Sequence, residues 1–180
     1  TKVAYNTYIT SKIVFANTLM EMAHNIPGCD CDAVVDALSK ATRRIISPAY
    51  MRGGMGDSGK WHPRDLIAMS WLARRLGLSC NLFDMLARAR ECQALWLVDM
   101  LISHARQIPR APVILGKSFK PESNITTGSC ALLCANLLTA QDIQFEHYDP
   151  YLDEMPIFNE PRAFLIATKH KQFAVMKFPA

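Results

Sequence analysis

Through the first half of the chain, apolar side chains recur every three or four positions, which is the spacing of amphipathic helices. The pattern predicts helices over residues 6–23, 32–40 and 65–76, and a longer helix from an N-cap at Asn81 to about residue 107. Pro27 and Gly28 end the first of these helices, and Gly77 ends the third. Because the apolar stripe of the longest helix is wide, we expect this helix to join two domains or to form the seam of a dimer.

From residue 111 the apolar pattern changes from the helical period to short strands. Residues 112–116 form one buried apolar run, residues 144–149 alternate, and residues 163–168 form a third strand. A helix over residues 129–140 separates the first two strands. This order of strand, loop, helix and strand is typical of a parallel α/β sheet, so the sequence predicts an α + α/β fold.

Composition and charge narrow the class of protein. The net charge is +4, and basic residues are doubled only at Arg43-Arg44 and Arg74-Arg75, which argues against a nucleic-acid partner. No apolar run reaches the roughly 18 residues that cross a bilayer, so no membrane partner is expected.

The first residues begin inside a helical pattern, which suggests a fragment of a longer protein. The six cysteines lack the spacing of a zinc site or a redox pair; we expect buried reduced thiols, no metal and a cytoplasmic location.

The loop over residues 116–124 is the first candidate for chemistry. It follows the first predicted strand, at the end of the sheet where open α/β proteins bind ligands. Lys117, Lys120, two hydroxyls and the start of the following helix could hold a phosphate group. Because the loop lacks the glycine spacing of the known phosphate-binding motifs, a plain surface loop is an equal alternative.

The glycine-rich segment over residues 52–65 is the second candidate, since glycines let a backbone approach a ligand closely. His62 could titrate near neutrality, although a solvated loop histidine is the more common case. Asp65 is either the N-cap of the next helix or a functional carboxylate. Lys2 and Asn6 lie one helical turn apart and share a face, which makes them the third candidate. These segments alone do not decide a function.

Taken in order, five segments resemble the UDP-glucose/GDP-mannose dehydrogenase family. They are Lys2–Asn17, similar to the family's Lys-xxx-Asn helix running into Lys-Ile-x-Phe-x-Asn; Arg44-Ile45 with Pro48–Arg52; Gly54–Asp65, similar to the catalytic loop that ends Pro-Lys/Arg-Asp; Gly116–Pro121, similar to Gly-Leu-Ala-Phe-Lys-Pro; and Ala167–His170, similar to Ala-Thr-x-His.

The resemblance implies a helical central dimerisation domain over residues 1–108 and a partial Rossmann-like nucleotide-sugar-binding domain over residues 109–180. It also implies an NAD-binding domain missing from this chain. Members of the family use NAD to oxidise the C6 hydroxyl of UDP-glucose, GDP-mannose or a related sugar twice, by way of a cysteine thioester, for polysaccharide biosynthesis. The expected partners are therefore a nucleotide sugar and a second copy, paired through the long central helix.

The resemblance also assigns roles to single residues. Lys2 matches the lysine that stabilises oxyanion charge, Asn6 the amide that holds the reacting oxygen and a water, and Asp65 the carboxylate that helps to activate water. The implied substrate-binding residues are Arg44, Tyr50, Met51, Arg52, Gly56, Phe119 and Lys120.

Several positions depart from the family pattern, and two of them bear on the chemistry. Trp61 stands where the nucleophilic cysteine is expected, and an indole cannot form a thioester. Thr127 stands where the family has an arginine after the Phe-Lys-Pro loop. If the whole protein is an enzyme, this fragment alone is expected to be inactive. The alternative is a catalytically inactive homologue that binds nucleotide sugar or acts as a dimeric scaffold. A helical interaction module unrelated to the family is a third, weaker reading.

Overall fold

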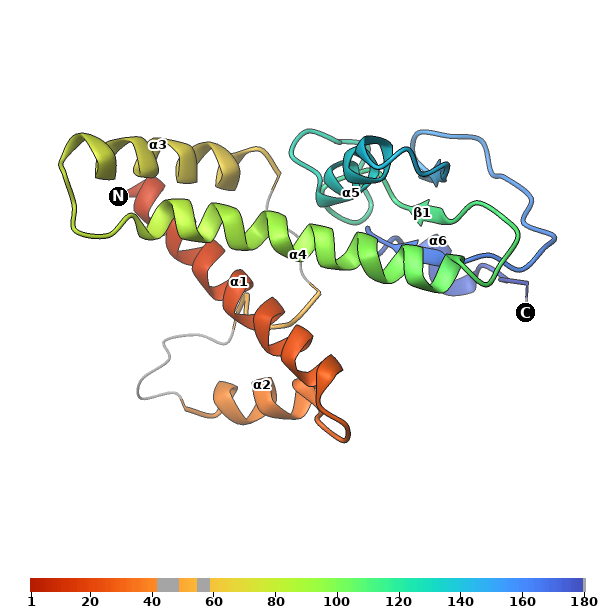
Figure 1. Cartoon of the computed structure of the whole chain (residues 1–180), viewed down its shortest axis with the longest axis horizontal. Coiled ribbons are helices and arrows are strands. Elements are labelled where there is room, and N and C mark those ends of the chain that lie inside the picture. The colour runs from red at the N-terminus through yellow and green to blue at the C-terminus, as the bar shows by residue number, and fades with distance from the viewer. Residues whose placement is uncertain (42–48, 55–58, 180) are drawn as a thin grey trace. The chain divides into compact units, whose positions relative to one another are not determined.

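The computed structural model describes residues 1–41, 49–54 and 59–179 (Figure 1). Its elements are, in order, α1 (Lys2–Asn25), α2 (Cys31–Ser39), α3 (Trp61–Arg75), α4 (Leu82–Ala105), β1 (Val113–Leu115), α5 (Cys130–Ala140), β2 (Glu146–Tyr148), β3 (Phe164–Ile166) and α6 (Lys171–Val175). They belong to two compact units: an N-terminal unit of residues 1–57 and 61–93, and a C-terminal unit of residues 58–60 and 94–180. The boundary expected near residue 108 separates functional domains, and it stays a prediction.

The N-terminal unit is built on α1, which packs against both α3 and α2. Its buried apolar cluster takes Val14 from α1, Leu66 from α3 and Leu86 from α4. The predicted helices are present, and Asn81 caps α4 as expected, since its Oδ1 accepts a hydrogen bond from the Asp84 N–H at 3.3 Å. This unit carries the candidate residues of the first helix and of the glycine-rich segment.

The start of α3 corrects the sequence prediction. The helix begins at Trp61 rather than at Asp65, so Asp65 lies in its second turn and is not an N-cap. In the sequence, Pro63 indicates the end of the loop, but a proline is also compatible with the first turn of a helix, where its missing N–H would have no partner in the helix. The correction matters because it places Trp61, His62 and Asp65 on one rigid element.

The C-terminal unit holds the predicted parallel sheet, in the order β2-β1-β3. Every residue of β1 is buried, because the sheet is covered on both faces. One face packs against α5 and the second half of α4, with Ile114, Leu138 and Val98 in the shared cluster. On the other face, Val113, Leu115 and Tyr148 of the sheet pack with Phe173 of α6. Helix α6 was not predicted, because its five residues are too few to show a helical period.

The cysteines correct a second expectation. Of the six, only Cys134 is buried, while Cys29, Cys80 and Cys92 are exposed. All six are free thiols. A hydrogen bond with Cys130 and burial in the core both raise the pKa of Cys134. In the parts of the chain that the structure describes, no helix is long and apolar enough to cross a membrane, and no group of His, Cys, Asp and Glu side chains is arranged to hold a metal ion.

Candidate functional site

A buried polar pair joins α1 to α3. The Asn6 Nδ2 donates a hydrogen bond of 2.7 Å to the Asp65 Oδ2, and both residues are buried. Lys2 lies one turn before Asn6, at the exposed start of α1, with its Nζ 5.2 Å from the centre of the Tyr5 ring. The structure therefore brings together two of the residues that the resemblance assigns to catalysis, and places Lys2 on the turn before them.

Asp65 is held as a carboxylate. Its Oδ1 accepts from the Arg64 Nε at 2.8 Å and from the Arg64 Nη2 at 2.5 Å, while its Oδ2 accepts from Asn6. Burial by itself would raise the pKa of Asp65, but the hydrogen bonds from Asn6 and Arg64 and the Arg64 charge outweigh it, so the pKa is lowered. A carboxylate with both oxygens engaged and a low pKa is a weak base. It is suited to orienting Asn6 and stabilising positive charge more than to removing a proton.

His62 extends this network and corrects a further expectation. It is buried in α3 rather than solvated in a loop, and its Nδ1 lies 2.9 Å from the Thr10 Oγ1. The Thr10 hydroxyl also bonds to the Asn6 carbonyl at 3.2 Å, so both contacts of this hydroxyl are hydrogen bonds when the neutral His62 ring carries its hydrogen on Nδ1. Burial lowers the pKa of His62, and the charge of Lys2 lowers it further against the opposing effect of Asp65. His62 is therefore neutral at pH 7.

Trp61 is the first residue of α3, and its side chain is half-exposed. The guanidinium carbon of Arg64 lies 4.5 Å from the centre of the Trp61 ring. Arg64 thus makes a cation–π contact with Trp61 while it pairs with Asp65. The position that the resemblance assigns to the nucleophile therefore lies one helical turn from the Asn6–Asp65 pair.

The segment before the glycine-rich loop is fixed to α1. Tyr50 has a φ of 64°, a left-handed conformation that costs a non-glycine residue about 1 kcal/mol or more and is often found at functional sites. Met51 is buried, and the Gly54 N–H donates to the Asn17 Oδ1 at 2.9 Å. Arg52 pairs with an exposed aspartate of α2 at 3.7 Å. Two further predicted substrate residues, Arg44 and Gly56, lie outside the described residues.

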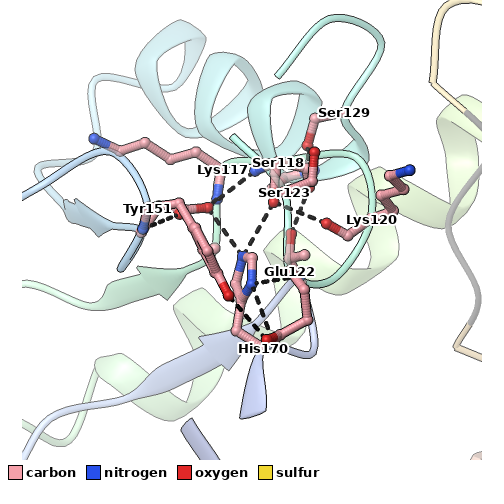
Figure 2. A network of polar contacts seen from close by, with 12 residues as sticks. Lys117, Ser118, Lys120, Glu122, Ser123, Ser129, Tyr151 and His170 are labelled. Atoms are coloured by element: carbon pink, nitrogen blue, oxygen red, sulfur yellow. Dashed lines mark hydrogen bonds and ion pairs between the residues drawn. The ribbon is translucent and has the colours of Figure 1, made fainter. Parts of the chain in front are cut away.

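The base of the loop that follows β1 is bonded to a buried carboxylate, Asp149. Figure 2 shows the polar network around Lys117 and Ser118 in this loop. The Asp149 Oδ2 accepts from the Lys117 N–H at 2.6 Å and from the Ser118 N–H at 3.1 Å. Burial would raise the pKa of Asp149, but the backbone N–H groups that bond to it lower the pKa overall. Because these two N–H groups already have an acceptor, they do not form a phosphate cradle. Lys120 is exposed at the tip of the loop, with its Nζ 5.5 Å from the Phe119 ring centre.

Ser118, His170 and Asp149 have the residue types of a hydrolytic triad but not its geometry. In a triad, the serine and the carboxylate bond to opposite nitrogens of the histidine. Here the His170 Nε2 faces both of them, 3.0 Å from the Ser118 Oγ and 3.2 Å from the Asp149 Oδ2. All three residues are buried, and the Ser118 hydroxyl donates to the Lys120 carbonyl. The cluster is a framework for the loop and does not supply a nucleophile.

The residues just before Trp61 pack onto the same loop region within the C-terminal unit. A Cβ on Gly128, whose φ is 78°, would lie 2.3 Å from the backbone of Gly59 and of Lys60. A Cβ on Gly59 would lie 3.2 Å from the Phe119 ring. Two segments that the sequence predicts to contact substrate therefore touch through glycines, because any larger side chain would push them apart.

Comparison with known proteins gives a family model and several relatives. The model of the UDP-glucose/GDP-mannose dehydrogenase family, central domain, matches residues 1–92. The chain is 27% identical over 150 residues to the UDP-glucose 6-dehydrogenase TuaD of Bacillus subtilis, covering 83% of this chain and 32% of that protein. It is 28% identical over 148 residues to the GDP-mannose 6-dehydrogenase of Pseudomonas putida, covering 82% and 33%. The chain thus spans about a third of the length of these relatives.

Solved structures with a similar fold support the predicted order of a helical region followed by a parallel sheet. A UDP-glucose dehydrogenase from the archaeon Pyrobaculum islandicum matches with a TM-score of 0.78 at 24% identity, covering 99% of this chain and 44% of that chain. A UDP-D-ManNAc dehydrogenase from Pyrococcus horikoshii matches with a TM-score of 0.76 at 21% identity, covering 97% and 42%. At these identities the similarity establishes the fold alone.

Proposed function

Because the chain belongs to the UDP-glucose/GDP-mannose dehydrogenase family, we propose that it is part of an NAD-dependent nucleotide-sugar 6-dehydrogenase. The whole enzyme would act on UDP-glucose, GDP-mannose or a related UDP-hexose, which members of the family oxidise to the uronic acid. The observation that carries this proposal is the buried Asn6–Asp65 hydrogen bond, in which two residues 59 positions apart come together at 2.7 Å. Burying an amide and a carboxylate costs free energy unless they are paired, so their presence on the facing sides of two helices supports a retained polar site.

The proposed roles of the side chains follow from their charges. Lys2 would stabilise the negative charge that develops on the oxidised oxygen, and Asn6 would donate a hydrogen bond to that oxygen. Asp65 would keep Asn6 oriented and accept a hydrogen bond from the attacking water. Phe119 and Lys120 would contact the nucleotide, with the exposed ammonium of Lys120 facing its phosphates. Tyr50, Met51 and Arg52 would contact the sugar part of the substrate.

Trp61 restricts the chemistry that this chain can perform. Its indole cannot be acylated, so no thioester forms at this position. The alternative function, binding of nucleotide sugar by an inactive homologue, rests on this residue. The pairing of Asn6 with Asp65 supports the enzyme, because both residues match positions with catalytic roles in the family and the structure brings them together. We propose that the chain by itself binds nucleotide sugar and is inactive.

NAD is proposed for the whole protein on family membership. The turn after β1 does not fit a dinucleotide, because its N–H groups at Lys117 and Ser118 already bond to Asp149. We therefore assign no NAD contact to the described residues. Six free thiols suit a reducing compartment, which supports a cytoplasmic location for the proposed enzyme.

A homodimer through α4 is proposed as well. Leu82, Met85 and Cys92 are exposed on α4, and their spacing places them on one side of the helix. A second copy would cover these apolar side chains. Sedimentation should show a dimer that Met85→Glu converts to a monomer, since burying an unpaired carboxylate opposes association. An unchanged dimer would place the seam elsewhere.

The experiment that tests the proposed function is calorimetric titration of the chain with UDP-glucose, UDP-glucuronate and GDP-mannose. We expect one of them to bind with a Kd in the micromolar range, about −8 kcal/mol. Lys120→Ala should weaken binding, while Lys169→Ala, an exposed lysine outside the loop, serves as the matched control. Trp61→Cys should bind at least as tightly, because it removes bulk beside the proposed sugar site. If none of the three binds at concentrations up to about 1 mM, the proposal that this chain binds nucleotide sugar is wrong.

A further inference from the structure

The outer part of the loop after β1 has an unusual backbone, and a histidine from outside the loop is bonded to it. Glu122 has a φ of 56°, in the left-handed region that a non-glycine residue rarely adopts. Its N–H donates a hydrogen bond of 3.0 Å to the His170 Nδ1. Such a conformation persists only where the surroundings hold it, and the group that bonds to its backbone here is a completely buried imidazole from outside the loop.

His170 reaches the loop at two points because its two nitrogens face opposite ways (Figure 2). Since Nδ1 accepts from Glu122, the neutral ring carries its hydrogen on Nε2, which faces Ser118 and Asp149. Ser118 and Glu122 bracket Phe119 and Lys120. The imidazole therefore spans the loop from its buried base to its outer turn.

Neighbouring contacts fix the ring and the carboxylate end of the turn. The His170 ring packs 5.1 Å from the Tyr151 ring and 5.5 Å from the Phe173 ring, measured between centres. The Glu122 carboxylate accepts from the Tyr151 hydroxyl at 2.8 Å and from the Lys171 N–H at 2.9 Å. The Tyr151 bond ties the outer turn to the segment after β2, and the Lys171 bond ties it to the start of α6, the helix that follows His170.

We propose that His170 is a positioning residue that holds the turn at Glu122 and so fixes the conformation in which Phe119 and Lys120 meet the nucleotide part of the substrate. This inference rests on the proposed function for its ligand, a nucleoside diphosphate sugar, but not for its structural content. The bond that matters is the one from the Glu122 N–H to Nδ1. Asp149 keeps three backbone N–H donors without the histidine, so the base of the loop is held independently.

Two amide substitutions separate the two ends of the imidazole. His170→Asn places its amide oxygen near the position of Nδ1, so it can still accept from Glu122. His170→Gln places its amide near the position of Nε2, so it keeps a donor toward Ser118 and Asp149 and loses the Glu122 bond. Leu138→Ala, which removes a fully buried core side chain from α5 in the same unit, is the control for general loss of stability.

The readout that needs no ligand is hydrogen exchange at the Glu122 amide, resolved by NMR. We expect exchange to be about tenfold faster in His170→Gln than in the wild type, and close to the wild-type rate in His170→Asn, because only the latter keeps an acceptor. Leu138→Ala should accelerate exchange across the core of the unit without singling out Glu122. Equal exchange at Glu122 in the two His170 variants would overturn the inference.

The second readout is nucleotide-sugar affinity, measured by calorimetry. His170→Gln should bind about tenfold more weakly, because the loop must then be ordered at the expense of binding free energy, and His170→Asn should restore most of the affinity. If the loss of affinity in every variant, Leu138→Ala included, simply followed its loss of thermal stability, His170 would contribute only to the stability of the core and would not position the loop. Failure of the wild type to bind would refute the proposal that this chain binds nucleotide sugar, and the exchange rates would still decide whether His170 positions the loop.

Discussion

The coupling free energy between Asn6 and Asp65, which share a hydrogen bond, should be much larger than that between Arg64 and Asp65, which form an ion pair. Both contacts reach the same carboxylate, but their surroundings differ. Asn6 is 5% exposed, whereas the Arg64 side chain is 56% exposed. When Asp65 is removed, Arg64 can turn into water, while the buried Asn6 amide is left without its acceptor.

The expected magnitudes follow from this difference. A hydrogen bond to a charged group contributes about 1.5–3 kcal/mol, and we expect a coupling free energy in that range for Asn6 with Asp65. An exposed ion pair contributes about 0.2–1 kcal/mol, which is the expected coupling for Arg64 with Asp65. The pKa of Asp65 lies below the ordinary carboxyl value, so its stabilisation is complete above that value and is lost as the pH falls through the folded-state pKa.

Two double-mutant cycles with Asn6→Ala, Arg64→Ala and Asp65→Ala measure both couplings by urea unfolding. Tryptophan fluorescence in a Trp96→Phe background reports on the N-terminal unit, because the remaining tryptophans, Trp61 and Trp71, both lie in α3. The Asn6–Asp65 coupling should persist at pH 5 and shrink once the carboxyl is protonated. A coupling below about 0.5 kcal/mol, or one no larger than that of Arg64, would refute the reasoning.

Two further predictions concern a glycine contact and a buried histidine. Gly128→Ala should lower the thermal stability much more than Gly28→Ala. Both glycines have nearly the same positive φ, but of the two only Gly28 has open space for a Cβ. Similar losses in the two variants would show that the Gly59–Lys60 backbone moves aside at little cost. Because burial lowers the pKa of His62 below its unfolded value of about 6.5, the unfolded state takes up a proton first as the pH falls, and the free energy of unfolding should decrease from pH 7 toward pH 5. His62→Gln should flatten this part of the urea-unfolding profile, and an unchanged slope would mean that His62 is not buried.

The sequence predicts the elements of this fold well, because helices and strands leave periodic signals along the chain. It places α4 and its Asn81 cap, and it identifies the parallel strands around β1. It misplaces the start of α3, because a proline inside a first turn looks the same in sequence as a proline that ends a loop.

The contacts that build the candidate site are much harder to predict from the sequence. Thr10 and His62 are 52 positions apart, and nothing in the periodicity of either segment indicates their bond. Asn17 was recognised as part of a motif, but its bond to the Gly54 N–H depends on how the loop folds back on α1. Asp149 gave one usable signal, since an acidic residue at the end of a predicted strand lies at the ligand-binding end of a parallel sheet. Its partner His170 comes from a different segment, and only tertiary structure joins the two.

The packing of Gly59 and Lys60 against Gly128 also limits how this protein can be recombined. These two residues belong to the C-terminal unit, although the segments before and after them belong to the N-terminal unit. A chimera with a single crossover between Gln93 and Ala94 would therefore transplant Gly128 without its partner backbone. Relatives with a larger residue at either glycine position should be poor donors in such exchanges. Shuffled libraries should retain the two glycines together far more often than independent inheritance predicts.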